Sequence, residues 1–341
     1  MASLLTIYIA WFWTLFLISV SANDVSTGGP SSPFPAIFMF GDSSVDNGNN
    51  NYLVSFAKAN FMPYGINTSW DPTGRFSNGK MTIDLLGELL GHSYLSSFEM
   101  TQTQGSNITW GGNYASAATV ILDETGRYLG QRITFNEQVR NFQTTMNKLK
   151  ATMDDMNLSR YLAKFVGIRE SWKQRLHKQL SLSLHALGLR KFLLAAVGPL
   201  GCIPNQISRG LFPIGACKDD VNMVILFNDR LKSLVDELNT QYNGTSIFVY
   251  GNSYAALMQI IQDPNTYGFQ ATNIACCGIG MFQGRISCLP FEIPCSNRDK
   301  YVFWDAFHPS EAMDKILASR AFNGSTSDCY PINVSQMAIM F

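Results

Sequence analysis

The sequence predicts an α/β protein with three layers, α/β/α, in which helices cover both faces of a mainly parallel central sheet. Two observations support this fold class. Short apolar runs alternate with longer segments of helical periodicity, which is the pattern of strand–helix–strand units. The chain also contains no internal repeat, no low-complexity linker and no change of composition, so most of its 341 residues are expected to form one domain.

Four apolar runs are the expected strands of this sheet. Each run ends near Gly, Asp, Asn or Pro, and their composition is typical of strands buried in a parallel sheet. Sheets of this kind place their active sites at the carboxyl ends of the strands. The four runs are Ala36–Phe40, Asn113–Ile121, Phe192–Val197 and Ile247–Tyr250.

Three further segments predict helices. One begins at Phe135, and its apolar residues recur at alternating spacings of four and three up to Met153, which gives a helix with one apolar face. The segment Val221–Leu238 predicts a second helix. The segment Pro309–Arg320 predicts a last one, because proline is favoured at the first helical position.

The first residues predict a secretory signal peptide. An apolar run, Leu4–Val20, is followed by the small residues Ser21 and Ala22, which form a cleavage pattern. We therefore expect residues 1–22 to be removed and residues 23–341 to form the mature, secreted domain. An uncleaved membrane anchor is the alternative, because no basic residue precedes the apolar run. No later run approaches the ~20 apolar residues of a membrane span, so the mature chain is expected to lack a transmembrane segment.

Six N-x-S/T sequons agree with export. Their number and their spread along the chain predict a glycosylated surface. The asparagines are Asn67, Asn107, Asn157, Asn243, Asn323 and Asn333.

The seven cysteines are also consistent with an oxidising compartment, in which most would pair and one would be left over. The pairing stays open; our hypothesis joins Cys202 to Cys217 and two of the cysteines within Cys276–Cys295. Zinc is the alternative use of cysteines. No C-x-x-C pair or neighbouring histidine provides its ligand spacing, so neither a metal nor another cofactor is expected.

The charge of the chain bears on its partners. The formal net charge is zero, and Lys and Arg are not gathered into one basic tract. Because the phosphates of a nucleic acid demand a cationic face, no nucleic-acid partner is expected. The oligomeric state leaves no trace in the sequence.

The first expected strand ends in a polar cluster, GDSS at Gly41–Ser44. A plain polar turn would explain this cluster, and so would a strand whose carboxyl end presents a serine nucleophile. A nucleophilic Ser43 requires a base that can hold a proton near neutral pH. In either case Asp42 is expected to bond amides of the turn, and Asp46 and Asn47 to organise the loop that follows.

Four histidines are candidates for that base. His92 follows a predicted helix end, and His177 and His185 lie in a stretch rich in Lys, Arg and Leu, so packing or solvated roles are predicted for these three. His308 differs, because Asp305 precedes it by three residues in an apolar run just before a helix. A carboxylate in that position can orient the imidazole and stabilise its charged form, although Asp305 could equally cap the helix.

These segments are similar to blocks of the plant GDSL esterase/lipase family, within the SGNH hydrolases. GDSS after FMF, followed by VDNGNNN, resembles the first block of the family, and WDAFHPSEA resembles the last. The change in the first block is Ser44 in place of the usual leucine. Further similar segments continue from about residue 35 to the C-terminus: DPTGRFSN (71–78), GGNYASAATVILDETG (111–126), GPLGCIP (198–204), CCGIGMFQGRISCLPFEIPC (276–295) and AFNGSTSDCYPIN (321–333).

The resemblance implies a secreted serine ester hydrolase with a flavodoxin-like SGNH fold. Ser43 would attack the ester carbonyl, His308 would take and later return the proton, and Asp305 would orient His308. The substrate would be a small-molecule or lipid ester, with acyl lipids, cutin-like polyesters and acylated sugars as the classes considered. An acyltransferase is an alternative, since an alcohol could capture the same acyl-enzyme.

Two departures from the family concern the oxyanion hole. The resemblance implies three donors: the backbone N–H of Ser43, a glycine N–H of the second block and an asparagine side chain. Val120 stands at the glycine position; it keeps a backbone N–H, but its β-branched side chain excludes positive φ. The G-x-N-D segment that would carry the asparagine is absent, and after NLSRYLAK the chain reads FVGIRESWKQRLHKQLSLSLHALGLRKF.

The absent segment predicts a truncated central strand, of which Phe165–Ile168 is the expected remnant. An apolar stripe from Ile168 to Leu187 predicts that a helix follows. We hypothesise that the chain is a spliced variant or the product of a mispredicted gene model. Transcript sequencing across Lys164–Leu187 decides this, because reads that restore a strand and a G-x-N-D segment would show that the sequence is an artefact. A catalytically impaired binder of acyl ligands is the second functional alternative, because losing one oxyanion donor typically costs about 100- to 1,000-fold in rate.

Overall fold

The structure is a computed structural model, which describes residues 36–69, 72–104, 111–119, 126–151, 166–169, 183–210 and 221–340. The chain divides into two units, Met1–Ser31 and Ser32–Phe341, and every described residue belongs to the second. The predicted signal peptide, Val120 and the sequons at Asn107 and Asn157 lie outside the described residues.

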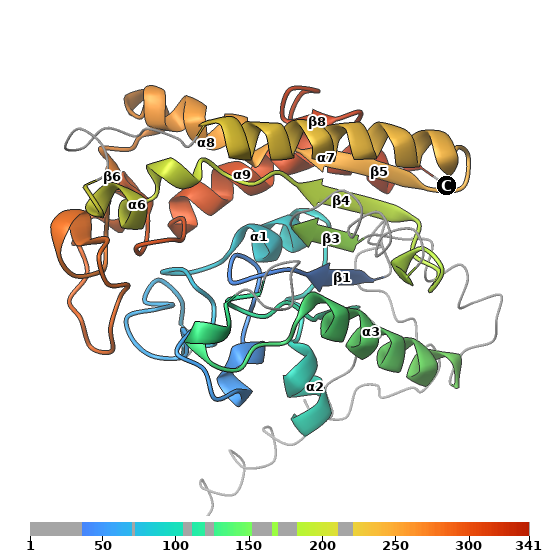
Figure 1. Cartoon of the computed structure of the whole chain (residues 1–341), viewed down its shortest axis with the longest axis horizontal. Helices are drawn as coiled ribbons and strands as arrows, with labels where there is room; N and C mark the ends of the chain where they lie inside the picture. The colour runs from blue at the N-terminus through green and yellow to red at the C-terminus, as the bar shows by residue number, and fades with distance from the viewer. Residues whose placement is uncertain are drawn as a thin grey trace, which may run out of the picture. The chain divides into compact units, whose positions relative to one another are not determined.

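Six strands of the described residues form the central sheet (Figure 1). In the order β2-β1-β3-β4-β5, neighbouring strands are parallel, and β8 closes the sheet antiparallel to β5. This mainly parallel sheet confirms the predicted α/β class. The strands are β1 Ile37–Phe40, β2 Gly111–Asn113, β3 Val166–Arg169, β4 Lys191–Ala195, β5 Ile247–Gly251 and β8 Cys329–Tyr330.

Strands β1, β4 and β5 agree with the predicted runs, whereas the second predicted strand, Asn113–Ile121, was wrong in its position. β2 ends at Asn113, the first residue of the predicted run, although the N–H of Tyr114 still donates to the carbonyl of Met39 at 2.8 Å. Upstream, Gly111 permits close pairing, since a Cβ there would lie 1.8 Å from the carbonyl oxygen of Ile37.

Strand β3 is the region that the sequence predicts to be truncated. It is four residues long, and it pairs in parallel with β1 on one side and with β4 on the other. The central strand is therefore short but present, close to the expected remnant Phe165–Ile168. Ile168 lies in this strand, so the predicted helical stripe does not begin there. At the far end of that stripe, Leu184 is buried in the core.

Helices are found close to each predicted position. α3 begins at Phe135 as predicted, and α7 contains the predicted second helix. α9 begins at Glu311 rather than at Pro309, because Ser310 is its N-cap and accepts a hydrogen bond from the N–H of Met313. The helices are α1 Thr82–Leu89, α2 Phe98–Gln104, α3 Phe135–Lys150, α6 Pro204–Ser208, α7 Val221–Gln241, α8 Ser253–Gln262, α9 Glu311–Asn323 and α10 Val334–Ala338.

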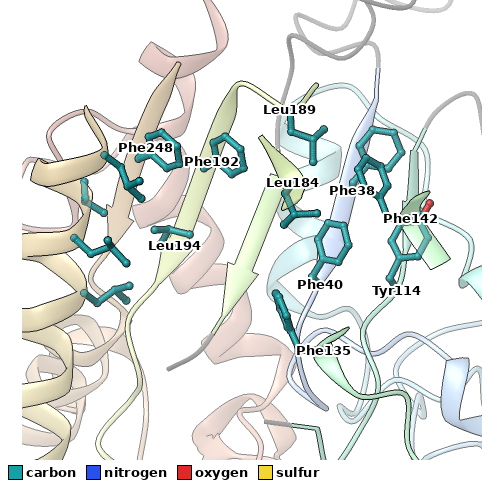
Figure 2. Close-up of a cluster of buried hydrophobic side chains, with 14 of the residues drawn as sticks. Phe38, Phe40, Tyr114, Phe135, Phe142, Leu184, Leu189, Phe192, Leu194 and Phe248 are labelled. Atoms are coloured by element: carbon teal, nitrogen blue, oxygen red, sulfur yellow. The ribbon is translucent and has the colours of Figure 1, made fainter. Parts of the chain in front are cut away.

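The two faces of the sheet carry separate hydrophobic cores, and β1 contributes to both because its side chains alternate. Phe38 and Phe40 join the core that also contains residues of α3 and α7; Figure 2 shows these two rings with Tyr114, Phe135 and Phe142. Ile37 and Met39 join the opposite core, together with residues of α1, α9 and α10. The strand that precedes the predicted nucleophile is thus fixed from both sides.

A small second sheet carries the remainder of the predicted site. Its parallel strands are β6 Ala271–Ala275 and β7 Tyr301–Phe303. Two disulfides, Cys276–Cys295 and Cys277–Cys288, close the loop between these strands and confirm pairing within the predicted segment. Cys202 is also disulfide-bonded, and its predicted partner Cys217 lies outside the described residues. Cys329 is a buried free thiol, in agreement with one cysteine left over.

Candidate functional site

The nucleophile turn is the segment Gly41–Val45, which follows β1 at the carboxyl edge of the sheet. The carboxylate of Asp42 accepts hydrogen bonds from the backbone N–H of Ser44 at 2.8 Å and from its hydroxyl at 2.6 Å. Asp42 therefore holds the turn, as predicted. Ser43 is half-buried and lies between Asp42 and Ser44, which these hydrogen bonds hold in place.

The structure brings Ser43, His308 and Asp305 together from opposite ends of the chain. The Oγ atom of Ser43 lies 2.8 Å from Nε2 of His308. The Nδ1 atom of the same ring lies 2.8 Å from Oδ1 and 2.9 Å from Oδ2 of Asp305. A serine hydroxyl, an imidazole and a carboxylate in this order form a path along which the hydroxyl proton can move to the imidazole.

Asp305 is completely buried, and four donors surround its carboxylate. Besides the ring of His308, the backbone N–H groups of Phe307 and His308 donate to Oδ1, and the hydroxyl of Tyr64 donates to Oδ2. Burial by itself would raise the pKa of Asp305, but the charge of His308 and these hydrogen bonds outweigh it and hold the pKa below its ordinary value. Asp305 is therefore ionised at neutral pH.

Tyr64 is a residue of the site that the sequence did not indicate. Its hydroxyl donates a hydrogen bond of 2.6 Å to Asp305, and its ring packs edge-on against Trp304 with ring centroids 6.1 Å apart. Burial, and then the negative charge of Asp305, raise the pKa of Tyr64 well above its ordinary value, so the hydroxyl stays a donor. It comes from a loop 241 residues earlier, and neither periodicity nor motif spacing could link the two positions.

The segment DPTGRFSN, which resembles a family block, supports the imidazole from the other side. The ring of Phe76 lies 4.9 Å from the ring of His308, measured between centroids. Arg75 forms a buried two-bond ion pair with Asp84 of α1 at 2.8 Å, which ties this segment to the helix. Asn78 accepts a hydrogen bond from the first residue of α9, so the segment also fixes the helix that follows His308.

Asp46 directly follows the nucleophile turn, and its carboxylate joins the loop at Gly48–Asn49 to a second turn, residues 116–119. One carboxylate oxygen accepts from the N–H groups of Gly48 and Asn49, and the other accepts from the N–H of Ala117 at 2.9 Å. The predicted role of Asp46 in organising the following loop is confirmed and extends beyond that loop. Burial raises its pKa to about 6, and the backbone hydrogen bonds oppose that rise. Asn47 donates to the carbonyl of Leu95 at 2.6 Å.

The described residues include one of the predicted oxyanion donors. Among them, no acceptor receives a hydrogen bond from the backbone N–H of Ser43, so this donor is available to a substrate. Val120 and the residues that follow β3 lie outside the described ranges.

Two other described histidines have the packing roles that the sequence predicts. His92 is buried and lies three residues after the end of α1. His185 lies 3.0 Å from the hydroxyl of Ser246, and its ring is 4.0 Å from that of Tyr242. Burial lowers the pKa of His185, and the nearby Arg190 lowers it further. His177 lies outside the described residues.

Four sequons fall on described residues and differ in exposure. Asn243 and Asn323 are exposed. Asn67 is exposed but bonds to Arg298 and to Glu311. The side chain of Asn333 caps α10 and donates to the carbonyl of Gly324, so it is engaged in the fold.

Comparison with known proteins extends over most of the chain. The family model described as GDSL-like Lipase/Acylhydrolase matches residues 37–321. Among curated proteins of Arabidopsis thaliana, GDSL esterase/lipase At5g08460 is 44% identical over 364 residues, which cover 97% of this chain and 94% of that relative. GDSL esterase/lipase At1g71250 is 45% identical over 335 residues, covering 90% and 89% of the two chains. GDSL esterase/lipase At1g29670 is 43% identical, covering 89% and 91%.

One of these alignments also bears on the absent segment. It runs over 364 positions, which is more than the 341 residues of this whole chain, although it uses 97% of them. The relative therefore has a few tens of positions in the aligned region for which this chain has no residue. This difference agrees with the expectation that several tens of residues of the family pattern are absent.

Proposed function

The chain belongs to the GDSL-like lipase/acylhydrolase family and is a carboxylic ester hydrolase, and we propose that Ser43, His308 and Asp305 are its catalytic residues. The observation that carries this proposal is the chain of hydrogen bonds from Ser43 through His308 to Asp305. The first and second members of that chain are 265 residues apart in sequence, so local structure does not account for their contact.

The geometry supports acyl transfer through a covalent intermediate. The Oγ atom of Ser43 attacks the ester carbonyl as its proton passes to Nε2 of His308. The resulting imidazolium returns the proton to the leaving alcohol, and a water molecule then hydrolyses the acyl-serine by the same path in reverse. Buried Asp305 accepts from Nδ1 throughout, which fixes the ring orientation and stabilises its charge.

The developing oxyanion requires donors of its own. The backbone N–H of Ser43 supplies one of them, and we assign the second to the N–H of Val120. The third donor of the family, an asparagine in G-x-N-D, is absent from this sequence. We therefore expect a catalytic rate about 100- to 1,000-fold lower than that of an enzyme with all three donors, which is the usual effect of one lost donor.

The nucleophile is tested by Ser43→Ala, with Ser319→Ala on the exposed side of α9 as the matched control. Hydrolysis of p-nitrophenyl acetate is expected to fall at least about 1,000-fold in Ser43→Ala, because a triad without its nucleophile keeps only binding and oxyanion stabilisation. The control should keep the wild-type rate. Equal rates for wild type and Ser43→Ala would refute the assignment.

Export is the proposed setting of this activity. The predicted signal peptide and the exposed sequons at Asn67, Asn243 and Asn323 support a secreted, glycosylated protein. No helix among the described residues is both long and apolar enough to cross a membrane. N-terminal sequencing of the exported protein tests cleavage after Ala22; an intact Met1 would contradict it. Small-molecule or lipid esters are the proposed substrates.

A further inference from the structure

A cavity opens next to the proposed catalytic residues, on the face of the sheet that α1 and α9 cover. Its wall includes Ser44 and Pro309, the chain neighbours of Ser43 and His308. The other end lies at Arg320 and Asp328. About 860 Å³ of space within it is free of protein atoms, counting the part that is open to solvent.

The wall between these ends is largely hydrocarbon. Met39 of β1 and Leu193 of β4 form the side made by the sheet. Leu86 of α1 and Leu317 of α9 form the side made by the helices, and Ala321 continues it one turn further along α9. Because strand side chains alternate, Met39 faces away from the aromatic core of Figure 2 and into this space.

Several polar groups in the wall already bond to protein atoms. The Ser44 hydroxyl donates to Asp42, and the Ser253 hydroxyl donates to the carbonyl of Ala196. The hydroxyl of Thr82 donates to Asp314 at 2.5 Å. At the far end Arg320 pairs with Asp328 at 3.3 Å. A polar ligand would have to break such bonds to bind, whereas an aliphatic chain would leave them intact and bury apolar surface.

We propose that this cavity binds the acyl chain of the ester, so that esters of aliphatic acids longer than acetate are the preferred substrates. The inference rests on the proposed function, because it assumes that the acyl carbonyl lies at Ser43. Protein interiors are close-packed, and an unfilled apolar space costs stability in proportion to its volume, so a ligand is the reason to keep one beside a nucleophile. Each methylene that enters should improve kcat/KM by up to about fourfold.

The cavity wall contains the residue at which the first block departs from the resembled family. Ser44 stands where that block has leucine, and Ser44 lines the cavity. A serine fills less of the cavity beside the nucleophile than a leucine would. Ser44→Leu is therefore expected to discriminate against long acyl chains.

The test compares p-nitrophenyl octanoate with p-nitrophenyl acetate. The ratio of kcat/KM for the two esters should fall at least about tenfold in Ala321→Phe, because a phenyl group fills the cavity and up to about fourfold is lost per methylene. Ser319→Phe adds the same group on the exposed side of the same helix and should leave the ratio unchanged. Leu86→Ala enlarges the cavity and should move the preference to longer chains. An unchanged ratio in both Ala321→Phe and Leu86→Ala overturns the inference.

A binding measurement separates this inference from the proposed function. Calorimetric titration of Ser43→Ala with decanoate should show saturable binding that is lost in Ser43→Ala/Ala321→Phe. Decanoate binding without any ester hydrolysis by the wild type would support the cavity and refute the catalytic assignment. If hydrolysis requires Ser43 but decanoate does not bind and the chain-length preference does not change, the catalytic assignment is supported and the acyl-chain cavity is refuted. Thermal unfolding of each variant shows whether the comparison is between folded proteins.

Discussion

At the scale of single residues, Asp305 has a donor beyond those that a serine triad needs. The hydroxyl of Tyr64 lies 2.6 Å from the carboxylate oxygen Oδ2, in a place without solvent access to Asp305. A hydrogen bond to a charged, buried acceptor is worth about 1.5–3 kcal/mol. Tyr64 therefore acts as a positioning residue, since it keeps Asp305 ionised and oriented toward His308.

We predict that Tyr64→Phe lowers kcat/KM about 10- to 100-fold, the rate equivalent of that hydrogen bond. Removing a donor from the ionised form raises the pKa of Asp305, so the acid limb of the pH–rate profile should move to higher pH. Steady-state rates between pH 4 and pH 8 measure both effects. Tyr94→Phe is the control, because Tyr94 donates to Glu88 on the exposed side of α1. A lower rate with an unchanged acid limb of the pH–rate profile would show that Tyr64 acts through packing and not through its hydrogen bond to Asp305.

The sequence contained the three catalytic candidates because each lies in a short motif with a local reason for its position. Ser43 follows a predicted strand, and Asp305 precedes His308 by three residues. Tyr64 had no such signal, since its contact depends on a fold that brings together two segments 241 residues apart. Residues whose role comes from the tertiary structure alone were beyond what periodicity and spacing can predict.

At the scale of elements, Asp46 links the turn at Gly48–Asn49 to the turn at residues 116–119. Its carboxylate accepts from Gly48 and Asn49 in one turn and from Ala117 in the other, and it has no exposure to solvent. Burial raises its pKa to about 6, above the ordinary value of 3.8, so the folded chain holds this proton more tightly than the unfolded chain. The contribution of Asp46 to stability is therefore largest at low pH and falls as pH rises through about 6.

We predict that the stability difference between wild type and Asp46→Asn depends on pH. Asparagine does not titrate, and its Nδ2 group would face the N–H of Ala117 without an acceptor. Wild type should lose up to about 3 kcal/mol relative to the variant as pH rises from 4 to 7.5, the equivalent of the pKa shift. Urea unfolding at these two pH values measures the difference. A gap that stays constant between them would contradict the raised pKa.

Elements were predictable in type more reliably than in extent. α3 begins where the apolar stripe begins, because the stripe packs against β1 and Thr134 caps the helix. β2 ends where the predicted strand was to start, because the chain already pairs with Ile37 at Gly111. α9 starts after Pro309 because Ser310 is the better cap. These boundaries depend on close backbone pairing and on a capping bond that an apolar pattern does not reveal.

At the scale of the whole molecule, the sheet is continuous although the family pattern is not. β3 keeps four residues between β1 and β4, and these suffice to pair the strands on both sides. We expect the absent positions to follow this strand, at the edge of the sheet that carries the proposed catalytic residues. The fold can therefore persist while the reaction loses a donor.

We predict that restoring the segment raises the rate. A segment that carries the G-x-N-D block of the resembled family, inserted after β3, would bring that asparagine to the edge of the sheet. kcat for p-nitrophenyl acetate should rise about 100- to 1,000-fold, the usual value of one oxyanion donor. The matched control carries the same insertion with that asparagine replaced by alanine, and it should stay at the low rate. Equal rates for the two insertions would show that the segment acts through the fold and not through the donor.

The separation of Ser43 from His308 along the chain has a consequence for synthesis. The two residues are 265 positions apart, so at about 5–20 residues per second roughly 10 to 50 seconds pass between their appearance from the ribosome. During that time the serine has no base, and any chain that stops before residue 305 carries a nucleophile that cannot react. The proposed catalytic arrangement can therefore form only when translation is nearly complete.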